Sequence, residues 1–361
     1  MAVHRHTVLG IMSGSSLDGV DFATCDFTLD PGAPDPIIDW GIGEADTVEY
    51  PADWQSRLRS ATRLSAADLC RLDTELGTWI GRQAAGFLAN GQAGSAGLIG
   101  CHGHTVYHEP AAGYTLQIGS GAAIAAATGI PTVTDLRSAD IAAGGQGAPL
   151  APVADRHLFP GYAAYLNLGG IVNFSLRRSD SSLLAGDLTG CCQILDRLAA
   201  AAGMRYDAGG QLARSGHLLS PLLDRLRALP FHHQPSPKSL SNQWVTDTLW
   251  PIVAEAEGST ADRLHTTVEF IAETVARSLD GVIPAEGKVL VTGGGANNDY
   301  LCERIGAKVG RGLASPPLIA DFKEAALVAL CAMLRYYELP NSIASATGAR
   351  RDTVNGALYV P

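Results

Sequence analysis

Short apolar runs typical of β-strands alternate along the chain with glycine-rich loops and longer helical patterns. The first run covers residues 7–13, and a second run over residues 20–27 follows it after a loop of Gly, Ser and Asp. Because strands and helices take turns, the pattern predicts an α/β fold. Further strands are predicted at residues 97–101, 115–118, 130–134, 163–168, 171–176 and 288–292.

Four helices are predicted between and after these strands. Ser65 with Asp68 forms a capping pair that opens the first helix, while Gly129 and Gly281 are expected to end the second and third. In the third, leucine, isoleucine and valine side chains recur on one helical face, which indicates packing against a sheet. The predicted helices cover residues 66–90, 121–128, 260–279 and 321–338.

The strand–glycine loop–strand layout of residues 7–27 occurs again in residues 163–176, around Gly169 and Gly170. The two segments share the layout but not the amino acids. Two such units in one chain are expected of a duplicated nucleotide-binding fold with two lobes. Since domains have roughly 100–200 residues, a length of 361 residues also predicts two of them.

Composition narrows the possible partners. The net charge is −10 with no basic block, so nucleic acid is not an expected partner. The chain has no apolar run of about 18 residues and no signal-peptide pattern, so we expect no membrane segment. Its seven cysteines form no CxxC pair, which indicates reduced thiols in a cytoplasmic protein.

The first loop has the chemistry of a phosphate site. Gly14, Ser15, Ser16 and Gly19 allow backbone N–H groups and hydroxyls to surround one anion. Carboxylates cannot bind phosphate directly, so the acidic residues of the loop predict a magnesium ion between them and the phosphates. The loop lacks the Gly-Lys-Ser/Thr of a Walker motif. An ordinary hairpin with a polar turn is the alternative. The metal ligands expected are Asp18 and Asp21.

An ordered set of motifs over nearly the whole chain resembles the anhydro-N-acetylmuramic acid kinases, which are actin-like sugar kinases. The family usually has Thr at position 15 and Gln at position 104. The matching motifs are MSGSSLDGVD (residues 12–21), HGHTVYHEP (102–110), TLQIG (115–119), DLRSADIAAGGQGAP (135–149), NLGGIVN (167–173), YDAG (206–209), PKS (237–239), GGGANN (293–298) and KEA (323–325).

The resemblance implies a two-lobed actin-like ATPase (ribonuclease H-like) fold with a nucleotide cleft between the lobes. Residues 1–133 and about 340–361 would form the first lobe, and residues 134–339 the second. The implied reaction uses ATP and Mg²⁺: water attacks the anomeric carbon of 1,6-anhydro-N-acetylmuramic acid, the internal bridge opens, and the freed O6 takes the γ-phosphate. The partner is a small anhydro sugar, and homodimers occur in the family.

The matched motifs also imply roles for individual residues. Asp187, which follows an apolar run, is the expected general base. Arg137 is expected to bind a lactyl carboxylate or a phosphate. The expected ATP- and phosphate-binding residues are Gly14, Ser15, Ser16, Leu17, Asp18, Gly19, Val20, Asp21, Gly169, Gly170, Asn173, Gly293, Gly294, Gly295 and Asn297. The expected sugar-binding residues are His102, His104, Asp135, Arg137, Asp140, Gly145, Gln146 and Glu324.

One stretch departs from the family. The family typically reads Phe-Asp-Thr-Gly-Pro-Gly-Asn around its catalytic carboxylate, whereas this chain reads GDLTGCCQILD over residues 186–196. Asp187 remains, but Cys191 and Cys192 stand in the altered part. Because this loop is expected on the sugar side, the difference leaves two alternatives open: a kinase of another 1,6-anhydro sugar such as levoglucosan, or a non-catalytic nucleotide-binding relative.

Several residues also have other interpretations. His102, His104 and His108 with Glu109 resemble part of a zinc site. The glycines at 293–295 resemble a dinucleotide fingerprint, although Asn298 stands where its third glycine belongs. Three alternatives are purely structural. In these, Arg137 forms an ion pair with Asp135 or Asp140, Asp187 caps a turn, and Gly169–Gly170 is a bulge in a core strand.

Overall fold

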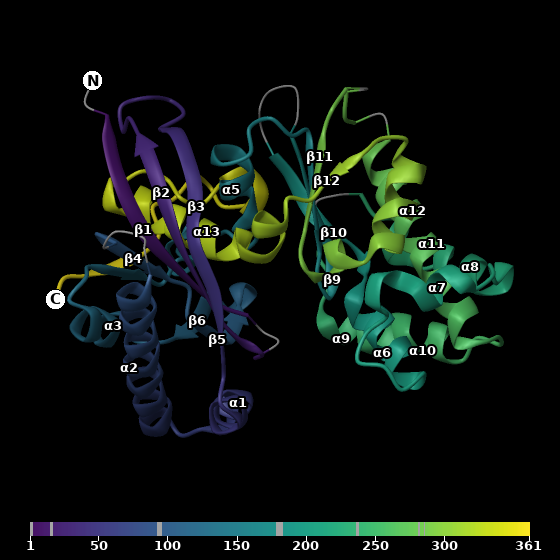
Figure 1. The fold of residues 1–361 in the computed structure, drawn as a ribbon, viewed down its shortest axis with the longest axis horizontal. Helices are drawn as coiled ribbons and strands as arrows, with labels where there is room; N and C mark the ends of the chain where they lie inside the picture. The colour runs from purple at the N-terminus through teal and green to yellow at the C-terminus, as the bar shows by residue number, and fades with distance from the viewer. Residues whose placement is uncertain are drawn as a thin grey trace. The chain divides into compact units, whose positions relative to one another are not determined.

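The computed structural model describes residues 3–14, 17–91, 96–177, 183–235, 238–280, 282–284 and 286–361. The chain divides into two units, which are Met1–Phe159 with Phe322–Pro361 (unit 1) and Pro160–Asp321 (unit 2). Each unit contains one main β-sheet with helices packed on it (Figure 1). The α/β class predicted from the sequence is confirmed. Among the described helices, none combines the length and the hydropathy needed to cross a membrane.

Unit 1 contains a six-stranded sheet in the order β13-β7-β4-β1-β2-β3. β1, β4 and β7 are parallel, while β2 is antiparallel to both of its neighbours. A separate antiparallel pair joins β5 and β6. The strands are β1 His4–Ser13, β2 Gly19–Leu29, β3 Ile37–Glu49, β4 Leu98–Cys101, β5 His104–Glu109, β6 Tyr114–Ile118, β7 Thr132–Thr134 and β13 Ala357–Tyr359.

Unit 2 contains a five-stranded sheet in the order β10-β9-β8-β11-β12. β8, β11 and β12 are parallel, and β9 is antiparallel to β8 and β10. The strands are β8 Ala164–Leu168, β9 Ile171–Arg177, β10 Leu183–Gly190, β11 Val289–Thr292 and β12 Leu313–Ala314.

The two sheets have the same topology. Across the sheet of unit 1, five strands lie in the order β3-β2-β1-β4-β7, and across the sheet of unit 2 the order is β10-β9-β8-β11-β12. When the five strands of each unit are numbered along the chain, both orders read 3-2-1-4-5. In both, the second strand is the antiparallel one. The repeat that the sequence shows only as two glycine hairpins is therefore a repeat of whole sheets. This repeat confirms the two-lobed class of fold.

Helices cover the sheets of both units, and short 3₁₀ and π turns join them. The helices of unit 1 are α1 Ala52–Arg59, α2 Ala66–Asn90, α3 Gly121–Thr128, α4 Ser138–Ala142, α5 Ala151–His157, α13 Pro317–Tyr336 (from Phe322 on) and α14 Ala344–Thr347. Those of unit 2 are α6 Cys192–Ala201, α7 Gln211–Ser215, α8 Ser220–Arg227, α9 Asn242–Trp244, α10 Trp250–Ala254, α11 Thr260–Leu279 and α12 Asp299–Val309. The turns are η1 Ala61–Arg63, η2 Pro110–Ala112, η3 Ala208–Gly210, η4 Pro230–His233, η5 Val245–Leu249 and η6 Gly294–Asn297.

Sequence signals locate the helix ends well. Ser65 caps α2 by accepting a hydrogen bond from the backbone N–H of Asp68 at 3.2 Å, and Gly129 ends α3 in the left-handed conformation. α11 has its predicted range, although Gly281, the predicted stop, lies outside the described residues. α13 begins at residue 317 rather than 321.

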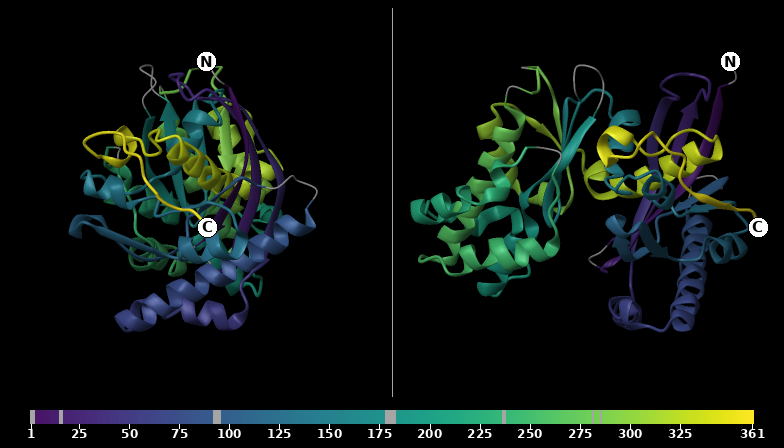
Figure 2. Two further views of the ribbon diagram at one scale, coloured as in Figure 1. Left: turned by 90° about the vertical axis from the view of Figure 1, so that its left-hand side faces the viewer. Right: turned by 180° about the vertical axis from the view of Figure 1, so that it is seen from behind.

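Unit 1 depends on a very close approach of α13 to its sheet. A Cβ on Gly10 of β1 would lie 1.9 Å from the carbonyl oxygen of Ala325, and one on Gly100 of β4 would lie 2.6 Å from that of Val328. Only glycine permits helix backbone and strand backbone to touch in this way. The view from behind in Figure 2 shows α13 (yellow) beside the purple strands of unit 1.

The unit boundaries differ from the predicted ones at residue 133 and about residue 340. Residues 134–159 and 322–339 belong to unit 1. The reason is packing that sequence patterns do not reveal: the contact of α13 with β1 and β4, and a buried ion pair between Lys323 and Asp155 at 2.5 Å.

β3, the longest strand among the described residues, was not predicted from the sequence. Aspartate, glycine and glutamate interrupt its apolar positions, and the strand lies at the edge of the sheet, where most of its side chains are exposed or half-buried. Its pairing with β2 along nearly its whole length defines it instead.

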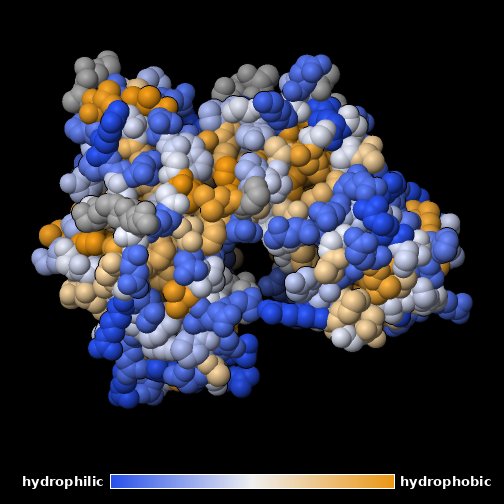
Figure 3. Space-filling model, viewed as in Figure 1, coloured by the Kyte–Doolittle hydropathy of each residue, from blue (hydrophilic) through white to orange (hydrophobic). Residues whose placement is uncertain are grey.

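On the surface of unit 1, hydrophilic residues gather over α1 and α2, at the lower left of Figure 3.

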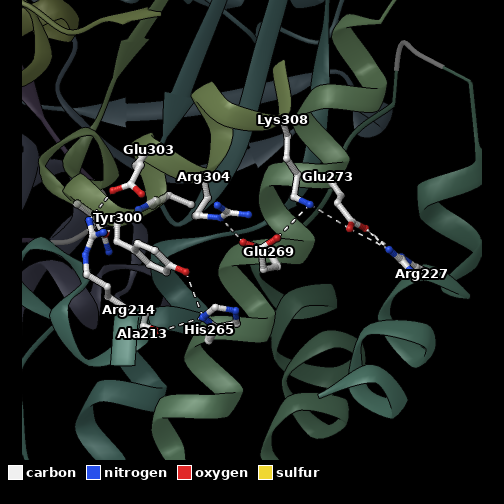
Figure 4. A network of polar contacts seen from close by, with 12 residues as sticks. Ala213, Arg214, Arg227, His265, Glu269, Glu273, Tyr300, Glu303, Arg304 and Lys308 are labelled. Carbon is white, nitrogen blue, oxygen red and sulfur yellow. Dashed lines mark hydrogen bonds and ion pairs between the residues drawn. The ribbon is translucent and has the colours of Figure 1, made fainter. Parts of the chain in front are cut away.

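Ion pairs connect helices α8, α11 and α12 of unit 2 (Figure 4). Glu269 of α11 pairs with Arg304 and Lys308 of α12, and Glu273 of α11 pairs with Lys308 and with Arg227 of α8. Such pairs are individually weak where they are exposed, so their effect is to fix the mutual positions of helices that apolar packing already joins.

We expect Gly10→Ala to destabilise unit 1 by about 1–3 kcal/mol, the usual cost of an overpacked core, because the new methyl group meets backbone that cannot yield without moving α13. Gly41→Ala is the matched control, because a Cβ on Gly41 of β3 would meet no atom within 4 Å. The measurement is the midpoint of thermal unfolding. Equal midpoints for the two variants would show that α13 does not approach β1 closely.

Candidate active-site residues

The parallel strands of unit 1 bring most of its predicted site residues to one edge of the sheet. β1, β4 and β7 are neighbours and end at Ser13, Cys101 and Thr134. Parallel strands end at the same edge, which is where α/β folds bind ligands. The segments that follow these strands are the loop at residues 14–18, His102 and Asp135.

The loop after β1 is strained and anchored. Leu17 has φ 61°, which a bulky side chain rarely adopts, yet its side chain is buried. The carbonyl oxygen of Asp18 accepts a hydrogen bond from the backbone N–H of Tyr50 at 3.1 Å, while its carboxylate is exposed. Ser15 and Ser16, two of the expected phosphate ligands, lie outside the described residues.

Two expected phosphate ligands next to this loop have structural roles. The side chain of Val20 is fully buried in the core of unit 1, so it lies away from any ligand. A Cβ on Gly19 would lie 2.7 Å from the carbonyl oxygen of Val48, so β3 itself requires glycine at this position.

Asp21 and Glu324 form an acidic pair in unit 1. Asp21 accepts a hydrogen bond from the hydroxyl of Thr47 at 2.6 Å. Glu324, from α13, is accessible to solvent, but the protein groups around it desolvate it, and this effect together with the charge of Asp21 raises its pKa. A divalent cation would relieve the repulsion between these carboxylates, so the donor set fits Mg²⁺.

His102 and Arg137 form the polar centre of this edge. Arg137 Nε donates to His102 Nε2 at 2.9 Å, so the ring proton of His102 belongs on Nδ1, which lies 3.0 Å from the carbonyl oxygen of Gly103. Burial and the charge of Arg137 lower the pKa of His102 to about 3, so the imidazole is neutral at physiological pH. Arg137 Nη1 also donates to the carbonyl oxygen of Gly147 at 2.7 Å.

Arg137 forms no ion pair with a carboxylate among the described residues, and the alternative of an ion pair with Asp135 or Asp140 is wrong. Burial lowers its pKa to about 10, which still leaves it charged, and the nearby charge of Glu324 acts in the opposite direction by raising the pKa. A half-buried guanidinium that forms no ion pair with a carboxylate has N–H groups left to bind an anionic ligand.

Asp140 supports this edge from inside and is placed differently from the expectation of sugar contact. It is 1% exposed, and its oxygens accept hydrogen bonds from Ser342, Thr347 and the backbone N–H of Gly147, all within 2.8 Å. A Cβ on Gly145 would lie 2.2 Å from the same carboxylate. Asp140 and Gly145 therefore shape the loop at residues 144–147 rather than contact a ligand.

Asp135, Gln146 and His104 were also expected to bind the sugar, and each has a polar side chain at this edge. Asp135 is exposed, has φ 57°, and accepts a hydrogen bond from the hydroxyl of Ser138 at 2.5 Å. The side chain of Gln146 is exposed, while its backbone N–H binds Thr347. His104 is buried, its Nδ1 has no hydrogen-bond partner among the described residues, and burial lowers its pKa.

The zinc interpretation fails in the described part of the chain. No group of three or more histidine, cysteine or acidic side chains is arranged there to hold a metal ion. His102 Nε2 is occupied by the donor Nε of Arg137, and His108 Nδ1 lies 3.1 Å from the hydroxyl of Thr115.

Unit 2 also brings predicted site residues to one edge of its sheet. β8, β10 and β11 end at the same edge, followed by Gly169–Gly170, by Cys191–Cys192 and by Gly293. Gly169 and Gly170 are the two-residue turn between β8 and β9, so the bulge alternative is wrong. Their carbonyl oxygens accept the N–H groups of Cys192 and Cys191 at 3.1 and 2.8 Å.

Nothing within the described part of unit 2 requires glycine at this turn. A Cβ on Gly169 or Gly170 would meet its nearest atoms at 3.6 and 3.7 Å, which are ordinary contacts, and neither residue is left-handed. The turn therefore leaves open backbone, as a phosphate grip needs.

The glycines after β11 have unequal roles. Gly293 has φ 83°, and a Cβ there would lie 2.3 Å from Asn167 Oδ1, while Gly295 is packed against Leu168. Gly294 has no atom within 4 Å of its Cβ position and, with Asn297, is exposed. Asn298, where a dinucleotide fingerprint needs glycine, caps α12 by accepting the N–H of Leu301 at 3.0 Å.

Asp187 lies inside β10 and is held by three donors. Its Oδ1 accepts from Asn173 Nδ2 at 2.5 Å, and its Oδ2 accepts from the hydroxyl of Ser239 at 3.1 Å and from the N–H of Leu240 at 2.6 Å. Its own N–H donates to the carbonyl oxygen of Lys238 at 2.8 Å. A β-bulge follows it, and the turn alternative is wrong. A carboxylate held in this way has one orientation, which suits a general base.

Three residues that hold Asp187 were given another role or none in the sequence-based prediction. Asn173, expected to bind nucleotide, holds Asp187. Ser239 and Leu240 were not predicted, although the PKS motif at residues 237–239 marks their segment. Lys238 fixes that segment by donating to the carbonyl oxygen of Phe231 at 2.9 Å.

The stretch that departs from the family is mostly interior. Leu188, Thr189 and Cys191 are each at most 1% exposed. A Cβ on Gly190 would lie 2.8 Å from the side chains of Val245 and Leu249. These residues complete β10 and enter α6, so the difference is accommodated as core packing. Within residues 188–193, only Cys192 and Gln193 are half-buried.

The repeated sheets, with glycine turns and polar side chains at their carboxyl edges, define a two-lobed actin-like α/β fold. A model of one family, anhydro-N-acetylmuramic acid kinase, matches residues 6–361. The chain belongs to the anhydro-N-acetylmuramic acid kinase family.

Individual relatives agree. The chain is 35% identical to the anhydro-N-acetylmuramic acid kinase of Nitrosospira multiformis, and the alignment covers 97% of this chain and 98% of that one. It is 33% identical to that of Mannheimia succiniciproducens with the same coverage.

Among solved structures, the ROK hexokinase of Thermus thermophilus has a TM-score of 0.37 at 15% identity, with 90% of this chain and 97% of that chain covered.

We expect His102→Gln to flatten the loss of stability at acid pH. The pKa of His102, about 3 in the folded protein, lies below the ordinary value of 6.5, so between these values the unfolded chain binds more protons. Stability is therefore fully present above pH 6.5 and falls as the pH is lowered toward 3. Glutamine keeps one acceptor and one donor but cannot be protonated there. Thermal midpoints over this range test the difference, and parallel curves for the two proteins would refute it.

Proposed function

We propose that this protein is an ATP-dependent kinase that opens 1,6-anhydro-N-acetylmuramic acid with water and phosphorylates O6, giving N-acetylmuramic acid 6-phosphate for cell-wall recycling. The observation that carries the proposal is the family match over residues 6–361, together with the retention of Asp187 in an ordered arrangement of hydrogen bonds. As a kinase of this family, the protein uses ATP.

Binding of the nucleotide is assigned to the open glycine positions. We assign the phosphates to the backbone of Gly14 and of the Gly169–Gly170 turn, and the adenosine to Gly294 and Asn297. Mg²⁺ would be held by Asp21 and Glu324, with Asp18 through water, and would neutralise charge on the transferred phosphate. Glu324, expected from the sequence to bind the sugar, is assigned to the metal instead because the charge of Asp21 acts on it.

Chemistry at the sugar is assigned to Asp187 and Arg137. Asp187 takes a proton from the water that attacks the anomeric carbon, while its three hydrogen-bond donors keep the carboxylate oriented. The C1–O6 bond breaks, and O6 accepts the γ-phosphoryl group. Arg137, which forms no ion pair with a carboxylate among the described residues, binds the lactyl carboxylate with its free N–H groups.

The alternatives left open by the sequence gain no support. The altered residues 188–191 are buried, so they do not by themselves indicate a different sugar such as levoglucosan. A non-catalytic role would leave the hydrogen-bonded Asp187 and the Arg137 guanidinium without a use.

The setting of the reaction is also part of the proposal. All seven cysteines are free thiols, which suits the reducing cytoplasm. The substrate is a small sugar, and a homodimer is expected from the family resemblance.

The first experiment is incubation with Mg-ATP and a panel of 1,6-anhydro sugars, followed by mass spectrometry. We expect 1,6-anhydro-N-acetylmuramic acid to gain one phosphate and one water, and levoglucosan to react much more slowly because it lacks the lactyl carboxylate. Gain of phosphate alone would identify a conventional kinase, and a better reaction with levoglucosan would contradict the assigned substrate.

The second experiment replaces the proposed base. Asp187→Asn should lower kcat by about 10²–10⁴-fold, the usual contribution of general-base catalysis, and leave the Kd for ATP unchanged. Asp196→Asn, nine residues further along the chain and exposed on α6, is the matched control and should keep full turnover. If Asp187→Asn turned over like the wild type, Asp187 would have no role in the mechanism.

A further inference from the structure

A pocket in unit 1 has none of the side chains assigned to the sugar among its lining residues. It has a volume of about 510 Å³ and lies between α4 and the segment at residues 350–354. The α4 side consists of the small side chains of Ala139, Ala142 and Ala143. Pockets that bind small molecules in proteins have about 300–1,000 Å³, so this one has room for a hexose-sized ligand.

The other side of the pocket is positively charged. Arg350 and Arg351 line it, both are exposed, and neither has an ion pair or a side-chain hydrogen bond to another described residue. Asp352, the acidic neighbour, uses Oδ1 to accept the backbone N–H of Ala344 at 2.8 Å. Paired arginine side chains bind oxyanions, and phosphate above all, through forked hydrogen bonds.

We propose that this pocket is a binding site for a small phosphate monoester, with the phosphate on Arg350 and Arg351 and the organic part against the three alanines. A dianionic phosphate satisfies both guanidinium groups at once, whereas a single carboxylate has only two oxygens to share between them. The product of the proposed reaction is itself a sugar phosphate, so binding of the product in this pocket would rest on the proposed function. Binding of a phosphate monoester as such does not depend on the proposed function.

Hydrogen bonds connect the pocket to Arg137. The N–H of Arg350 donates to the carbonyl oxygen of Ala143 at 3.2 Å, and a Cβ on Gly144, the next residue, would lie 3.6 Å from Arg350 Nη1. Gly144 begins the loop at residues 144–147. At the end of that loop, the carbonyl oxygen of Gly147 accepts from Arg137.

A second connection leads to the same loop. The carbonyl oxygen of Thr347, three residues before Arg350, accepts the N–H of Gln146 at 2.9 Å, and its hydroxyl donates to Asp140 at 2.8 Å. Asp140 in turn accepts the N–H of Gly147 at 2.8 Å. An anion that fixes the segment at residues 350–351 therefore orders the loop that holds Arg137, and binding of phosphate monoester should change the KM for the sugar.

Calorimetric titration with glucose 6-phosphate tests the binding site. We expect saturable binding to the wild type, at least about tenfold weaker binding to the Arg350→Gln/Arg351→Gln double variant, and no change for Arg63→Gln, an exposed arginine elsewhere in unit 1. Glucose should not bind. Equal affinity of the wild type and the double variant, or binding of glucose as tight as that of its phosphate, would overturn the proposal. Inorganic phosphate binding as tightly as the ester would overturn the assignment of an organic part.

Hydrogen–deuterium exchange tests the connection without relying on turnover. Glucose 6-phosphate should slow exchange at residues 144–147 in the wild type and not in the double variant, whose thermal midpoint should equal that of the wild type. Unchanged exchange in the wild type would overturn the coupling. Because both readouts are independent of catalysis, they can succeed in a protein that fails to phosphorylate any sugar, and this would refute the proposed function alone.

Discussion

The common edge of the parallel strands is the constraint on which the candidate site depends. In each unit, strands that run in the same direction must end together, so the segments after β1, β4 and β7, and those after β8, β10 and β11, are brought side by side whatever their separation in the chain. The antiparallel second strand adds a hairpin turn at the same edge. In both sheets this turn contains glycine, so residues 14–18 and Gly169–Gly170 occupy equivalent positions although their sequences differ.

Interior contacts turn this edge into a defined arrangement of polar groups. Gly10 and Gly100 let α13 touch the sheet, and α13 carries Glu324 to Asp21. Asp140, fully buried and hydrogen-bonded, shapes the loop that positions Arg137. In unit 2, Asn173, Ser239 and Leu240 orient Asp187. The groups proposed to contact ligands are thus positioned by residues that do not contact them.

The sequence predicted what periodicity and local chemistry can encode. The α/β class, the hairpin of β1 and β2, the capped helix α2 and the strand before Gly293 follow from spacing, caps and glycines. β3 and the unit boundaries did not follow, because β3 is defined by pairing with β2 and the boundaries by the contacts of α13. Among the site residues, Asp140 and Asn173 were given ligand roles because a matched motif does not distinguish a side chain that contacts a ligand from one that holds its neighbour. Ser239 and Leu240 come near Asp187 only through folding.

The proposed reaction couples hydrolytic ring opening at C1 to phosphorylation at O6 in one enzyme. The most direct measurement is turnover of 1,6-anhydro-N-acetylmuramic acid and ATP in ¹⁸O-labelled water, with the position of the label read by mass spectrometry of the product. We expect one ¹⁸O at the anomeric carbon and none in the transferred phosphate. Label in the phosphate, or none on the sugar, would contradict the proposed reaction.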